Sequence, residues 1–124
     1  MKDEIVTCTI LVLLVGLFVF TSHTINTGTK KLSDAIKEAE EAVFNTDDAK
    51  EEFDKAKKVW EKAKKPLFYI CEHSIIMDID ENITLGCEYI NEGDKEKAVV
   101  VFKKAKILLK DLRDREKLRL DNIF

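Results

Sequence analysis

An uncharged run near the N-terminus constrains this chain more than any other feature. Residues 5–22 read IVTCTILVLLVGLFVFTS and contain no Asp, Glu, Lys or Arg. A helix rises about 1.5 Å per residue, so this run spans about 27 Å, close to the roughly 30 Å hydrocarbon core of a bilayer. A helix in a soluble core normally keeps one polar face, which this run lacks. We therefore predict a transmembrane anchor over residues 5–22, preceded by a short tail over residues 1–4.

A cleaved signal peptide is the alternative interpretation of this run. Signal peptides have an apolar region of about 7–15 residues, followed by small residues at the cleavage site. Here the apolar run is longer, and residues 18–23 (FVFTSH) lack the small-residue pattern. These observations favour an anchor that stays attached to the mature chain.

The orientation of the anchor is left open by the charges around it. Counting Lys and Arg alone, Lys2 precedes the run and Lys30, Lys31 and Lys37 follow it, which weakly favours a C-terminal part inside the cell. A tail as short as residues 1–4, however, usually stays in the cytoplasm while the rest of the chain is exported. The two arguments point in opposite directions.

The chain after the run reads as helical throughout. Residues 23–31 (HTINTGTKK) are polar and contain Gly28, which predicts a short flexible linker. Beyond it, apolar residues recur every three or four positions, the spacing of one helix face. We predict an all-α fold in which the anchor is followed by a small antiparallel bundle of three to four helices over residues 32–124, with a C-terminal tail over residues 118–124. The four stripes are Leu32, Ile36, Ala39, Val43; Ala49, Phe53, Ala56, Trp60, Ala63; Ile76, Ile79, Ile83, Gly86, Ile90; and Ala98, Val101, Ala105, Leu108, Leu112.

Three features predict where these helices end. Residues 45–48 (NTDD) are rich in N-cap residues and lie where the first two stripes go out of phase. Pro66 is expected to end or bend the second helix, or to begin the third. Gly93 and Asp94 predict a tight turn, with Gly93 at positive φ after one helix and Asp94 capping the next. Such a turn makes the last two long helices an antiparallel hairpin.

Composition excludes several classes of protein. The 21 Lys and Arg against 24 Asp and Glu give a net charge of −3, which argues against a nucleic-acid partner. Four Gly, one Pro and no glycine-rich loop argue against a turn-rich β fold and a phosphate-binding loop. If Cys71 and Cys87 share one helix, they lie about 24 Å apart, beyond the roughly 7 Å limit for a disulfide. We predict that both are small buried apolar residues.

Chemistry-bearing residues are few. His73 is the only histidine within residues 32–124, and with Asp78 and Glu81 it suggests a ligand- or metal-sensing site. Residues 78–82 (DIDEN) begin like a calcium-binding loop, but Ile83 stands where that loop requires Gly. We expect no catalytic, cofactor or metal site, and no enzyme activity, because no nucleophile, base and orienting group occur together. His73 is expected to bond to a neighbouring helix.

Two further places are candidate interaction sites. Trp60 lies in a lysine-rich stretch over residues 55–65, so it either packs in the bundle with its stripe or docks on anionic lipid. The chain ends on Ile123 and Phe124, which either fill a groove between helices or dock on a partner.

Several of these features together resemble the domain-of-unknown-function family 4363 of Clostridia-like bacteria. Asp121, where members have Glu, and residues 76–77, where members often have acidic residues, depart from the family pattern. The resemblance implies a protein held in the cytoplasmic membrane with its helical part outside, without known enzyme activity, and an accessory role beside another integral membrane protein. It is carried by the N-terminal anchor, Trp60, Lys65-Pro66-Leu67, His73-Ser74, Ile79-Asp80-Glu81, Gly93-Asp94, Glu116-Lys117-Leu118 and Asn122-Ile123-Phe124.

We therefore expect a single-pass protein of the cell membrane whose helical domain is extracytoplasmic. Its expected role is a non-enzymatic accessory or interaction module for another membrane or envelope protein. The alternative is an extracytoplasmic domain that senses a ligand or a metal through His73. The lipid bilayer and an integral membrane protein are the expected partners, and the sequence does not predict an oligomeric state.

Overall fold

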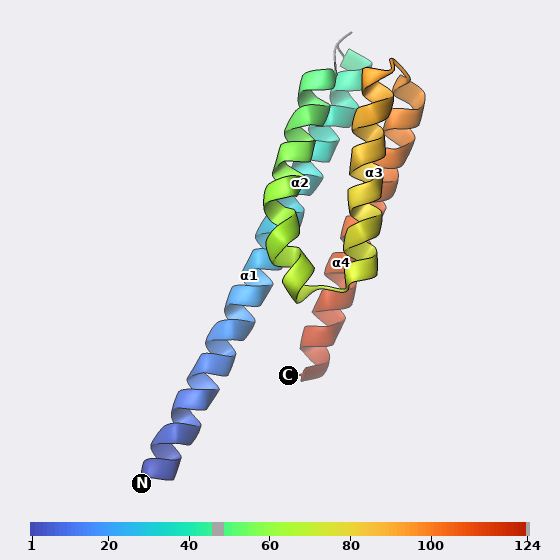
Figure 1. The fold of residues 1–124 in the computed structure, drawn as a ribbon. Coiled ribbons are helices and arrows are strands. Elements are labelled where there is room, and N and C mark those ends of the chain that lie inside the picture. The colour runs from blue at the N-terminus through green and yellow to red at the C-terminus, as the bar shows by residue number, and fades with distance from the viewer. Residues whose placement is uncertain (46–48, 124) are drawn as a thin grey trace.

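The computed structural model describes residues 1–45 and 49–123, apart from the side chains of Leu120 and Ile123. These residues form four helices, α1 (Lys2–Asn45), α2 (Lys50–Ile70), α3 (His73–Asn91) and α4 (Lys95–Ile123), and no strand (Figure 1). The predicted all-α class is confirmed, as is the order of a long apolar helix followed by a bundle.

The helices form an antiparallel bundle in which each packs against two neighbours. α1 contacts α2 and α4, and α3 contacts the same two helices from the opposite side. Short connections join α2 to α3 and α3 to α4, so the chain runs up and down the bundle. The N-terminal half of α1 extends alone beyond the bundle, and the C-terminal end of α4 lies on the same side as that extension (Figure 1).

The expected flexible linker over residues 23–31 is wrong, because α1 is helical without interruption from Lys2 to Asn45. Ile25 and Thr29 are buried against the bundle, which stabilises the helix through this polar stretch. The Thr29 hydroxyl donates a 2.6 Å hydrogen bond to the carbonyl of Ile25, so its polarity is satisfied within the helix. Gly28 costs about 1 kcal/mol of helix propensity, which the burial of its neighbours offsets.

The predicted stripes form the core. Leu32, Ile36, Phe53 and Trp60 are fully buried, and the rings of Phe53 and Phe102 stack with centroids 4.2 Å apart. The α4 stripe is rotated slightly from its prediction, since Leu108 is half-buried. The fully buried positions of that helix include Ala98, Phe102, Ala105 and Leu109.

α2 continues through Pro66 to Ile70, so Pro66 neither ends that helix nor begins α3. Its ring removes one backbone donor, but Leu67 directly after it is 1% exposed and holds the last turn in the core. The backbone N–H of Cys71 donates a 2.8 Å hydrogen bond to Leu67 and closes the helix. The last turns of α2 lean towards α3 (Figure 1).

The other two predicted breaks lie between helices. α1 ends at Asn45, and the capping expected from residues 46–48 lies outside the described residues. The turn at Gly93 is confirmed, with φ +84° at that residue. The N–H of Gly93 bonds to Ile90 and that of Asp94 to Tyr89, the pair of bonds that closes a helix at a glycine. The Asp94 carboxylate accepts from the N–H of Lys97 and caps α4.

Candidate functional site

The N-terminal half of α1 exposes most of its large apolar side chains. Among the described residues, α1 is the one helix long and apolar enough to cross a membrane, with a mean hydropathy of 2.5 over its best 18 residues. None of that window is buried by the rest of the chain. Leu11, Val12 and Leu13 are each more than half exposed. This surface is compatible with a single-pass anchor, and a signal sequence meets the same criterion.

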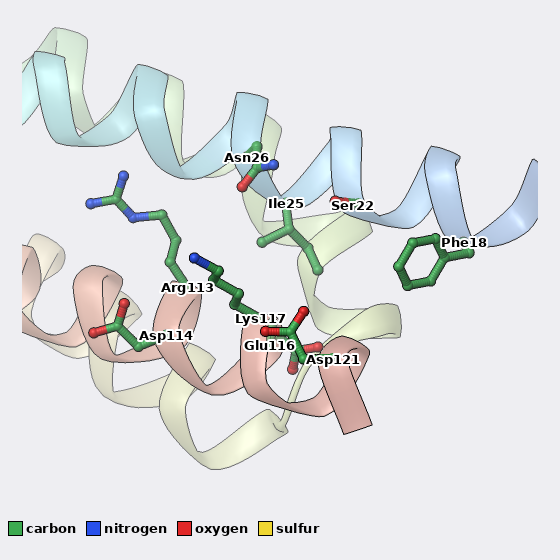
Figure 2. A pocket seen from close by; sticks show the side chains of 9 residues that line it. All are labelled: Phe18, Ser22, Ile25, Asn26, Arg113, Asp114, Glu116, Lys117 and Asp121. Atoms are coloured by element: carbon green, nitrogen blue, oxygen red, sulfur yellow. The ribbon is translucent and has the colours of Figure 1, made fainter. Parts of the chain in front are cut away.

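The bundle begins to cover α1 near Phe18 and buries it from Ile25 onwards. At this end of the bundle, two grooves flank α1, one against α4 and one against α2. We call them the α1/α4 groove and the α1/α2 groove. The first has a volume of about 470 Å³ and is lined by Phe18, Ser22, Ile25, Asn26, Arg113, Asp114, Glu116, Lys117 and Asp121 (Figure 2).

Charges of both signs line the α1/α4 groove. Arg113 and Lys117 extend from α4 towards α1 (Figure 2). Nε of Arg113 is buried and has no hydrogen-bond partner among the described residues. Glu116 is only 6% exposed, and its Oε2 lies 2.9 Å from Nη2 of Arg119. Burial raises the pKa of Glu116, although the Arg119 charge opposes this shift.

The α1/α2 groove is of similar size, about 450 Å³, and carries one sign of charge. Its floor is made by small or apolar residues, Gly28 from α1 and Val59, Ala63 and Pro66 from α2. Its rim carries two threonines and three basic residues, which are Thr24, Thr27, His23, Lys31 and Lys62. Sequence reasoning missed this groove, because it treated residues 23–31 as a linker.

Trp60 is fully buried in the core, so its indole is not available to a lipid surface. Its Nε1 donates a 2.8 Å hydrogen bond to Oδ1 of Asp80 on α3, and Nζ of Lys64 lies 3.2 Å from the same oxygen. Burial lowers the pKa of Lys64, but the bond to Asp80 and the charges of Asp80 and Glu61 raise it by more. The partner of Trp60 was missed from sequence, although a buried indole N–H requires an acceptor.

His73 is the first residue of α3 and lies exposed at the surface. Its ring stacks on Phe68 at the end of α2, with centroids 4.0 Å apart and an interplanar angle of 9°. Asp78 and Glu81 are exposed further along the same helix. Within residues 1–45 and 49–123, no group of three or more His, Cys, Asp or Glu is placed to hold a metal ion.

The cysteines of the bundle are free and buried, as predicted. Cys71 follows α2 and Cys87 lies on α3, so they do not share one helix. Burial raises the pKa of Cys71 to about 12 and that of Cys87 to about 11. The expected roles of Ile123 and Phe124 concern side chains that lie outside the described residues.

Comparison with known proteins gives one match. The family model for a domain of unknown function, DUF4363, matches residues 19–123. No curated protein and no solved structure matches the chain. The match covers all of the bundle and begins inside the apolar run. The chain therefore belongs to the DUF4363 family.

Proposed function

We propose that this protein is a single-pass membrane protein whose bundle serves as a non-enzymatic interaction module for another membrane or envelope protein. The observation that carries the proposal is α1 itself. One uninterrupted helix joins an exposed apolar half, long enough for a bilayer, to a half that is packed in the bundle. The bundle is thereby held directly above the membrane.

The way α1 enters the bundle supports a retained anchor over a cleaved signal. The family match begins at residue 19, within the apolar run, and Phe18 and Ser22 line the α1/α4 groove. Cleavage near residue 22 would remove these two side chains from the groove. It would also leave Ile25, a core residue, in the first turn of a fraying helix.

The α1/α4 groove is the surface that we assign to the protein partner. Its Arg113 has a buried N–H group without a partner among the described residues, and such groups are costly unless a ligand or partner satisfies them. Charges of both signs in the groove suit a polar protein segment. The groove begins beside the end of the apolar run, where a segment of a neighbouring membrane protein would leave the bilayer.

We place the bundle on the outer side of the membrane. The resemblance described under Sequence analysis implies this side, and the charges around the apolar run, Lys2 before it and Lys30, Lys31 and Lys37 after it, weakly favour the opposite one. A reporter fused after Phe124 tests this assignment: we expect activity from a reporter that works only outside the cytoplasm. Activity of a cytoplasmic reporter would reverse the topology and leave the anchor in place.

Two experiments in membranes test the proposal. Alkaline carbonate should leave the full chain in the membrane pellet, and release of a chain that has lost its first two dozen residues would overturn the anchor. A photo-crosslinking residue at Ser22 or Lys117, both in the groove, should then join the chain to one and the same membrane or envelope protein. Lys103, exposed on α4 outside the groove, is the matched control position. Equal crosslinking from Lys103 would contradict the assignment of the groove.

A further inference from the structure

We infer that the α1/α2 groove binds the phosphate headgroup of an anionic phospholipid from the leaflet in which α1 leaves the membrane. This inference rests on the proposed membrane anchor. It assigns to the groove a ligand class that is distinct from the protein partner proposed for the α1/α4 groove.

The charges of the groove are complementary to such a lipid. His23, Lys31 and Lys62 contribute basic groups, and none of the described residues that line the groove is acidic. No carboxylate of the described residues forms an ion pair with Lys31 or Lys62, whereas Lys55 and Lys97 each pair with one carboxylate and Lys64 pairs with two. These two lysines are therefore available to bind an anion.

The shape of the groove fits a molecule that is polar at one end and apolar along its length. Gly28 has no side chain, and a Cβ built there would lie 3.6 Å from Cβ of Ala63, so the two helices approach closely at the floor. Val59 and Pro66 continue this apolar floor on α2. The threonine hydroxyls at positions 24 and 27 stand beside it and are engaged within α1, since Thr24 donates to the carbonyl of Phe20 at 2.8 Å and Oγ1 of Thr27 lies 3.5 Å from Nε2 of His23.

The position of the groove along α1 places it at the headgroups. His23 follows the last residue of the uncharged run, and Lys31 lies eight residues later, about 12 Å further along the helix. The headgroup layer of one leaflet is about 5–8 Å thick. The backbone of Lys31 therefore lies beyond this layer, but side chains on a helix lean towards its N-terminus, so the amine of Lys31 reaches back towards the headgroups.

A second surface at the same end of the bundle supports this placement. Tyr69 on α2 is 84% exposed, and it lies beside Lys64, Lys65 and Phe68. Tyrosine and lysine are enriched where proteins meet the membrane–water interface. The end of the bundle that carries the groove therefore has the side chains of a surface that faces headgroups.

Native mass spectrometry of the full chain, released from nanodiscs that contain equal amounts of phosphatidylglycerol and phosphatidylcholine, tests the inference. We expect the wild-type chain to retain phosphatidylglycerol. The double variant Lys31→Gln/Lys62→Gln should retain less, by about fivefold for each lysine. The matched control Lys103→Gln/Lys104→Gln removes the same charge from exposed positions on α4 and should retain the lipid as the wild type does.

Three outcomes would overturn the inference. Equal retention of both lipids by the wild-type chain would show that headgroup charge is not recognised. Equal loss of lipid in the Lys31→Gln/Lys62→Gln and Lys103→Gln/Lys104→Gln variants would show a general effect of charge. Displacement of the bound lipid by millimolar inorganic phosphate would show that the groove takes a free anion. If the chain inserts into nanodiscs but fails these tests, only the proposed lipid site is contradicted. If the chain does not insert, the proposed membrane anchor is contradicted as well.

Discussion

Gly86 on α3 lies directly against the ring of Phe102 on α4, and a Cβ built at Gly86 would overlap the ring edge. Both residues are buried, so the ring has no open side into which it can turn. The glycine therefore sets how closely the last two helices pack.

Gly86→Ala is expected to lower the free energy of unfolding by about 1–3 kcal/mol, because the added methyl group overpacks the core. Chemical denaturation in detergent, followed by helical circular dichroism, measures the change. Gly28→Ala is the matched control, since its new Cβ would lie 3.6 Å from Ala63 at an ordinary contact distance. That variant should gain up to about 1 kcal/mol from helix propensity. Equal effects of the two variants would contradict the packing at Gly86.

Asp80→Ala is expected to cost about 1–3 kcal/mol, because it leaves the buried Trp60 indole N–H without its acceptor. The chain has a single tryptophan, so its fluorescence reports the change directly. Asp78→Ala removes the same charge from an exposed position of α3 and should alter neither stability nor emission. If both variants shift the emission alike, the bond does not hold the indole.

The two buried thiols make stability depend on pH on the alkaline side. Burial raises the pKa of Cys71 from 9.0 to about 12 and that of Cys87 from 9.0 to about 11. A thiol whose pKa is raised by folding stabilises the native state fully below pH 9, and this contribution is lost as the pH rises towards 11 and 12.

The unfolding free energy should therefore fall between pH 9 and 10.5 more steeply in the wild type than in the Cys71→Ala/Cys87→Ala variant. The difference in slope approaches about 1.4 kcal/mol per pH unit for each thiol. Comparing the two proteins cancels the titration of lysines and tyrosines that they share. Parallel curves would mean that the thiols ionise as easily in the native state as in the unfolded one.

The continuity of α1 predicts a fixed distance between its two halves. Spin labels at Cys8 and at Glu41→Cys, with the buried cysteines replaced by alanine, should give one narrow distribution near 50 Å. Double electron–electron resonance in nanodiscs measures it. Two glycines inserted after Ser22 provide the comparison and should broaden the distribution. A broad distribution in the chain without the insertion would mean that residues 23–31 are a flexible linker after all.

The repeating part of the fold could be predicted because its signal is local. Stripes spaced by three and four residues identified most of the core, and Gly93 identified the turn that its positive φ requires. Residues 23–31 and Pro66 misled the prediction, because their local preference for non-helical backbone is outweighed by the burial of Ile25, Thr29 and Leu67. Those contacts come from other helices and have no local sequence signature.

The candidate sites were harder to predict for the same reason. The α1/α4 groove pairs residues near position 22 with residues near position 117, which no spacing rule connects. Asp80 was noticed as part of an incomplete calcium-loop pattern, but its carboxylate serves Trp60 and Lys64 on α2. His73 stood out by its chemistry alone, and its neighbour is an aromatic ring.

The unbroken helix between Ser22 and Ile25 has a mechanical consequence. A stiff rod carries tilt and torque from one half to the other, so any rotation of the first half about its own axis swings α2, α3 and α4 around with it. A domain joined to an anchor by a flexible linker would sample many positions and orientations around it. With α1 as the proposed membrane anchor, the bundle would instead stay close to the point where the helix leaves the membrane, and the proposed partner would have to approach it there in the correct orientation.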